Sequence, residues 1–193
     1  MLIVYTPAVS LENKELQFFK EKGCKLYKRA EVLGMISHKL FTIAVAGTHG
    51  KTTTSTILAH ILQNSGKDST AFLGGISKNY NSNLLLAKKE NILIVEADEY
   101  DRSFLQLNPD VAIITSVDAD HMDVYKTKED LHKAFIQFTS QIKQKGILLV
   151  EESIDIDFPT PAKGEILTYS ANSKADYYAE NIRVKNRKMI LTS

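Results

Sequence analysis

The stretch that decides the fold is Ala46-Gly47-Thr48-His49-Gly50-Lys51-Thr52-Thr53-Thr54. An apolar run, Thr42–Ala46, precedes it, and an amphipathic segment that reaches about Gln63 follows it. The first is typical of a buried parallel strand and the second of a helix. Glycines between a strand and a helix let backbone N–H groups face an anion, and the helix start adds partial positive charge. The stretch is therefore predicted to bind phosphate.

The side chains of this predicted loop suit a nucleotide bound with a metal ion. Lys51 can reach the β- and γ-phosphates of ATP, and the Thr52 hydroxyl can bind Mg²⁺. The usual phosphate loop has glycine where Val45 stands, so this loop is a variant with a shortened glycine pattern. The alternative is a helix start that only happens to contain Gly-Lys-Thr. The predicted ATP-binding residues are Gly47, Thr48, His49, Gly50, Lys51, Thr52 and Thr53.

Outside the loop, short apolar runs alternate with amphipathic segments, which predicts an α/β fold with a mostly parallel sheet and flanking helices. Further buried strands are expected at Ile92–Val95, Val111–Val117 and Ile147–Val150. Thr127 resembles the cap of a helix, which would bury Leu131, Ala134, Phe135, Phe138 and Ile142. The helix after the phosphate loop would bury Ile57, Leu58, Ile61 and Leu62.

Two acidic segments directly follow predicted strands, at the sheet edge where α/β proteins bind ligands. They are Glu96-Ala97-Asp98-Glu99-Tyr100-Asp101 and Asp118-Ala119-Asp120-His121-Met122-Asp123. Glu96 is the first residue after its strand and is predicted to hold Mg²⁺, whereas Glu99 is expected to be exposed. His121 is predicted to bind a metal or an acidic substrate group, with a structural histidine as the alternative.

A glycine pair, Gly74-Gly75, and the nearby residues Asn79, Asn81 and Asn83 form a polar segment after a short strand. Its amide side chains could hydrogen-bond a substrate, and an ordinary turn-rich loop is the alternative.

Composition narrows the classes of function. The net charge of +1 gives no global reason to expect nucleic acid or an anionic membrane as a partner. No apolar run approaches the ~18 residues of a membrane span. The single cysteine, Cys24, rules out an internal disulfide, which favours a reducing, cytoplasmic setting. Cys24 is predicted to be a small packed residue.

Taken in order, the loop, the Glu96–Asp101 segment, Arg102-Ser103-Phe104-Leu105 and Asp120-His121-Met122-Asp123 resemble the Mur ligases of peptidoglycan synthesis. The pattern is most similar to the branch that joins L-alanine to UDP-N-acetylmuramate. The resemblance implies that ATP phosphorylates the muramoyl carboxylate and that the amine of L-alanine attacks the acyl phosphate. It also implies the catalytic residues Lys51, Glu96 and His121, with Thr52, Glu96 and His121 serving the metal.

The resemblance further implies how the chain divides. Residues 1–40 resemble the end of a Rossmann-like domain for the UDP-substrate, and residues 41–193 resemble much of the central ATP-binding domain. The glycine-rich start of the first domain and a third, C-terminal domain have no counterpart, so we expect an internal fragment that is inactive alone. Alternatives are the ligase that recycles a muramyl peptide, a hydrolytic nucleotidase and a non-catalytic nucleotide-binding module.

Overall fold

Eight strands form one sheet in the computed structural model, which describes residues 2–6, 8–89, 91–118, 124–180, 183–185 and 188–190. Their order is β10-β9-β8-β7-β3-β6-β4-β5, and β5 pairs antiparallel with β4 while the other neighbours run parallel. The predicted α/β class with a mostly parallel sheet is therefore confirmed. The strands are β3 Phe41–Ala46, β4 Thr70–Ser77, β5 Ser82–Leu85, β6 Ile92–Glu96, β7 Val111–Ile114, β8 Ile147–Glu151, β9 Glu165–Ser170 and β10 Tyr177–Tyr178.

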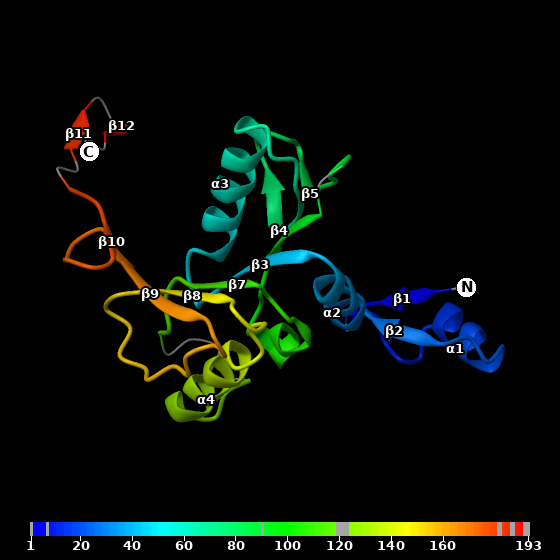
Figure 1. The fold of residues 1–193 in the computed structure, drawn as a ribbon. Helices are drawn as coiled ribbons and strands as arrows, with labels where there is room; N and C mark the ends of the chain where they lie inside the picture. The colour runs from blue at the N-terminus through cyan, green and yellow to red at the C-terminus, as the bar shows by residue number, and fades with distance from the viewer. Residues whose placement is uncertain are drawn as a thin grey trace.

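Helical segments cover both faces of this sheet (Figure 1). Helix α3, Lys51–Asn64, packs Ala59 against β4 and β6 on one face. On the other face lie α4, Lys128–Thr139, and the 3₁₀ helix η1, Tyr100–Gln106. The Phe104 ring of η1 stacks on Phe138 of α4, with 4.9 Å between centroids. The alternation along β6 fits this layering, because Leu93 and Val95 join the η1 and α4 core while Ile94 faces α3.

The apolar face predicted for α4 is confirmed for Leu131, Ala134, Phe135 and Phe138, which are all buried on the helix. Ile142 is buried too, but it lies beyond the end of α4 at Thr139. Thr127 caps this helix as expected, and its hydroxyl accepts a hydrogen bond from Asp130 N at 3.2 Å. The face predicted for α3 is only half right: Leu58 and Leu62 pack against the core cluster around Ala59, whereas the other two residues do not. Ile57 and Ile61 are 54% and 56% exposed, because α3 rests on the sheet through the small, fully buried Ala59.

Two further expectations fail at strand ends. Strand β7 ends at Ile114 rather than Val117, because Thr115 and Ser116 turn to hydrogen-bond the phosphate loop. Gly74 and Gly75, expected in a loop, lie inside β4. The strand β9 and the helix η1 had no counterpart in the sequence pattern.

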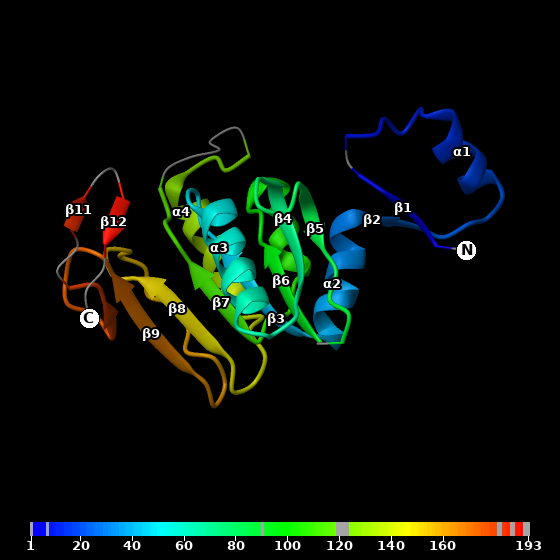
Figure 2. The same ribbon diagram turned by 90° about the horizontal axis from the view of Figure 1, so that it is seen from above.

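A small unit precedes the sheet. Strands β1, Ile3–Tyr5, and β2, Leu26–Lys28, pair in parallel beside α1, Lys14–Glu21, and lie on one side of the sheet in both ribbon views (Figures 1 and 2). Helix α2, Arg29–Lys39, joins this unit to β3. It approaches η1 so closely that a Cβ on Gly34 would lie 2.4 Å from the carbonyl oxygen of Gln106.

At the other end of the chain, strands β11, Arg183–Lys185, and β12, Lys188–Ile190, form an antiparallel pair. Both ribbon views place it on the side of the sheet opposite the N-terminal unit (Figures 1 and 2). Strand β10, in contrast, joins the large sheet in parallel with β9.

Candidate active site

The predicted phosphate loop joins β3 to α3 and is anchored on the end of β7. The Thr115 hydroxyl donates to the carbonyl oxygens of Ala46 and His49. Gly47 has a φ of 135° and Gly50, which caps α3, has a φ of 83°. A Cβ on Gly47 would lie 2.2 Å from Thr115 Oγ1, so the loop can approach β7 only with glycine at this position.

Thr48 and His49 connect the loop to the residues that follow β7. The Thr48 hydroxyl lies 2.9 Å from Ser116 Oγ and accepts a hydrogen bond from Asp118 N at 3.0 Å. His49 N donates to Ser116 Oγ at 2.9 Å. The His49 side chain is exposed, with Nε2 3.8 Å from an Asp118 carboxylate oxygen. Thr48 therefore braces the loop through its side chain and also through its backbone, whose N–H donates to Ser116 O at 3.0 Å.

Lys51 lies in the first turn of α3, but its ammonium group is already bound by protein oxygens. Its Nζ donates to Gly47 O at 2.7 Å and to both carboxylate oxygens of Glu99 at 2.8 and 2.9 Å. The exposed fractions of the two side chains are 11% for Lys51 and 0% for Glu99. The expectation that Glu99 is exposed was wrong, because a carboxylate can be buried when a cation and hydrogen bonds compensate its charge.

Thr52 and Glu96 meet one position further along the helix. The Thr52 hydroxyl donates to the Glu96 carboxylate oxygens at 2.9 and 3.0 Å. Gly74 N, from the neighbouring strand β4, donates to Glu96 Oε2 at 2.6 Å. A Cβ on Gly74 would lie 2.3 Å from that carboxylate, so glycine makes room for Glu96.

These two side chains fit a bound Mg²⁺, which prefers oxygen ligands from one or two protein groups together with phosphate and water. Within the described ranges, no group of three His, Cys, Asp or Glu side chains is placed to hold a metal. His121, the third predicted metal residue, lies in 119–123, outside the described residues, and its role stays a prediction.

The predicted asparagines lie apart from these contacts. Asn79, Asn81 and Asn83 fall in the β4–β5 connection and in β5, and all three are exposed. This connection is attached to α3 by Tyr80, whose hydroxyl lies 3.0 Å from His60 Nδ1. Their proposed contact with a substrate therefore stays a prediction.

A cavity of about 530 Å³ opens beside Glu96. One wall comes from the N-terminal unit and α2, and the other from the segment that follows β6. The sequence pattern could not reveal it, because its walls come from segments far apart in the chain. The charged residues in its lining are Lys28, Arg29, Glu31, Glu96, Asp98 and Arg102.

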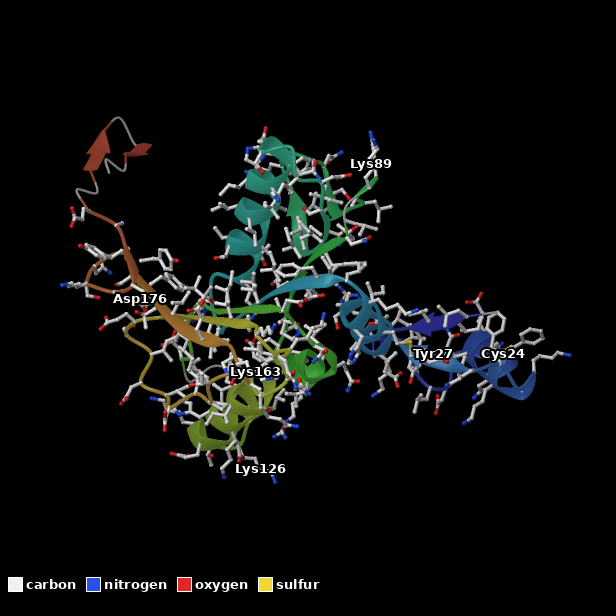
Figure 3. All side chains as sticks on the ribbon, in the orientation of Figure 1. Cys24, Tyr27, Lys89, Lys126, Lys163 and Asp176 are labelled. Carbon is white, nitrogen blue, oxygen red and sulfur yellow. The ribbon has the colours of Figure 1, made fainter. Side chains whose placement is uncertain are left out.

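The only cysteine of the sequence takes no part in this site. Cys24 is a free, half-buried thiol in the N-terminal unit, away from the large sheet (Figure 3). Within the described residues, no helix combines the length and the apolar character that crossing a bilayer requires.

Comparison with known proteins identifies the family. Residues 45–192 match the Mur ligase middle domain. The chain belongs to the Mur ligase family. The resemblance noted in the sequence is thereby confirmed, and the phosphate loop, Glu96 and Glu99 all lie in the matched Mur ligase region.

Individual relatives agree with this assignment. UDP-N-acetylmuramate–L-alanine ligase of Porphyromonas gingivalis is 48% identical over 192 residues, which are 99% of this chain and 42% of the relative. The structure of UDP-N-acetylmuramate–alanine ligase from Thermotoga maritima is 26% identical, with a TM-score of 0.74 over 93% of this chain and 40% of that one. A murein peptide ligase from Psychrobacter arcticus, 21% identical, has a TM-score of 0.76 over 99% of this chain and 45% of that one, a likeness in fold alone. This Mur ligase chain thus spans about two fifths of the curated relative.

Proposed function

We propose that the intact protein is an ATP-dependent amide ligase that joins L-alanine to UDP-N-acetylmuramate in the synthesis of peptidoglycan precursors. UDP-N-acetylmuramate–L-alanine ligase of Porphyromonas gingivalis is 48% identical along 99% of the chain, which supports the proposal. The observation that carries it is that Glu96 belongs to two places at once, the phosphate-loop contacts and the lining of the cavity. Its carboxylate accepts a hydrogen bond from Thr52 at 2.9 Å and also lines the 530 Å³ cavity. One carboxylate thus connects the phosphate loop to a space for a second substrate.

In this reaction the loop residues Gly47–Thr53 bind ATP, and Lys51 neutralises charge on the γ-phosphate. Thr52 and Glu96 hold Mg²⁺, which when bound supplies positive charge next to the phosphates. His121 is assigned to the metal or to the substrate carboxylate. Phosphoryl transfer depends on positioning and charge neutralisation more than on covalent help from the protein, and the contacts of Lys51 and Thr52 suit this demand.

The steps follow from the chemistry of the acid substrate. The γ-phosphoryl group of ATP passes to the muramoyl carboxylate, which gives an acyl phosphate and ADP. The amine of L-alanine attacks the acyl carbon, and the C–O bond to phosphate breaks as the amide forms. We assign residues 1–40 to the domain for the UDP-substrate and residues 41–193 to the ATP-binding domain. The cavity has walls from both, which supports it as the place for the acid end of that substrate.

The test is whether phosphate release depends on the amine. The intact protein, given Mg-ATP and UDP-N-acetylmuramate, should release phosphate rapidly only when L-alanine is added. Other amino acids and a free tripeptide serve as control amine acceptors. Equal phosphate release without L-alanine would point to a hydrolytic nucleotidase and overturn the proposal, and a preference for a free peptide acceptor would favour the recycling ligase.

A further inference from the structure

Glu99 is a buried carboxylate behind the phosphate loop, and the proposed reaction leaves it without a role. Its side chain is fully buried and binds Lys51 Nζ with both oxygens, at 2.8 and 2.9 Å. The third contact of that ammonium is Gly47 O at 2.7 Å. An ammonium group has three N–H donors, and these three acceptors match them. Lys51 is therefore held in one place before any nucleotide arrives.

The backbone of Glu99 is itself held firmly. Its carbonyl oxygen accepts a hydrogen bond from the hydroxyl of the buried Tyr125 at 2.6 Å and another from Arg102 N at 3.0 Å. Phe104, in the same 3₁₀ segment, is fully buried against the aromatic rings of α4. The carboxylate that holds Lys51 thus stands on the main hydrophobic core of the molecule, which restricts its movement.

We propose that Glu99 is a positioning residue, which holds the Lys51 ammonium where the transferred phosphoryl group will need it. A phosphate oxygen that reaches Lys51 must replace one of its three contacts. Because Glu99 binds through two oxygens, it can release one N–H and keep the other, so the ammonium moves little. This inference rests on the proposed function, and it assigns Glu99 no contact with either substrate.

A positioning role predicts a particular kinetic pattern. Removal of the Glu99 charge leaves the ammonium free to attract phosphate, so the affinity for ATP should change little. The ammonium would then be less well placed for the transition state, and misplacement by about 1 Å can cost about 100-fold in rate. In the intact protein, Glu99→Gln should lower kcat about 10- to 100-fold and change the KM for ATP less than about threefold.

Two variants bracket this result. Glu99→Asp keeps the charge on a shorter side chain and should recover part of the lost kcat. Glu165→Gln, at the exposed amino end of β9 and thus at the opposite edge of the sheet, should match the wild type. An unchanged kcat in Glu99→Gln overturns the proposal. So does a parallel loss of kcat, ATP affinity and thermal stability, which would indicate a purely structural residue.

Thermal unfolding of a double-mutant cycle measures the coupling between Lys51 and Glu99 even if the single variants lack activity. Lys51→Met should lower Tm, because the Glu99 carboxylate stays buried without the ammonium. Adding Glu99→Gln to Lys51→Met should raise Tm again, whereas in the wild-type background the same change should lower it. Equal effects in both backgrounds would mean that the residues are uncoupled.

If the wild type ligates no amine, the proposed function fails. ADP formation by the wild type and by Glu99→Gln still reports on the position of Lys51.

Discussion

The phosphate loop and the β4–β5 connection lie at the same edge of one sheet, yet their polar side chains are held very differently. In the loop, Thr48, Lys51 and Thr52 each contact a residue at the carboxyl end of a neighbouring strand or just beyond it. In the β4–β5 connection, the side chains of Asn79 and Asn81 are exposed. Polar residues at a strand end therefore become a preorganised site only when the adjacent strands supply partners at hydrogen-bonding distance.

The positions of the two regions in the sheet explain this difference. Strand β3 lies between β6 and β7, so the loop that follows it receives Glu96 and Glu99 from one side and Ser116 from the other. Strand β4 has β6 on one side and only its own hairpin partner β5 on the other. The asparagine side chains of the β4–β5 connection therefore face solvent, where a substrate could reach them but where little fixes their geometry.

The largest effect is expected from Lys51→Ala, which removes the charge that the loop brings to the phosphates. We expect kcat/KM of the intact enzyme to fall by about 10³-fold, in line with the loss of a preorganised group that stabilises transferring phosphoryl charge. Steady-state ligation assays measure this. The exposed Lys174→Ala is the matched control and should behave like wild type. Retention of most of kcat by Lys51→Ala would remove this residue from the mechanism.

A smaller effect is expected at the glycine pair of β4, which offers a matched comparison. In Gly74→Ala the new methyl group would lie 2.3 Å from the Glu96 carboxylate, whereas in Gly75→Ala its nearest neighbour is Thr52 Cγ2 at 3.6 Å. Gly74→Ala should displace Glu96 and raise the Mg²⁺ concentration for half-maximal activity about 10-fold. Gly75→Ala should change it less than about twofold, because its contact is ordinary. If the two variants needed the same Mg²⁺ concentration for half-maximal activity, Glu96 would not be a ligand of the metal.

The smallest effect is expected in the β4–β5 connection. The double variant Asn79→Ala/Asn83→Ala should raise the KM for UDP-N-acetylmuramate by about 3- to 10-fold and leave kcat unchanged, because lost ground-state hydrogen bonds weaken binding uniformly. Asn81 has a φ of 49°, so its side chain is best removed by Asn81→Gly, because glycine adopts this backbone conformation without strain. A drop in kcat as large as that of Lys51→Ala would break the contrast between the two regions.

Local patterns were sufficient where neighbours in sequence act together. The β3–loop–α3 unit, the strand before Glu96 and the cap at Thr127 all depend on contacts within a few residues, and all were predicted. The prediction for α3 was right for Leu58 and Leu62 but not for Ile57 and Ile61, because the helix faces the sheet with the small residue Ala59, which an apolar pattern of large residues does not reveal. The end of β7 was misplaced because its last residues bond the loop 66 to 68 positions earlier in sequence.

The sequence by itself determined the α/β class, the phosphate loop and the carboxylate at the end of β6, because strand, glycine and helix signals are local and agree with one another. Only the tertiary structure decided that Glu99 is buried against Lys51, that Gly74 makes room for Glu96 and that a cavity opens beside that carboxylate. Each of these depends on segments that lie far apart in the chain and meet across neighbouring strands. A carboxylate in an acidic segment, such as Glu99, is expected to be solvated unless the packing places a cation against it.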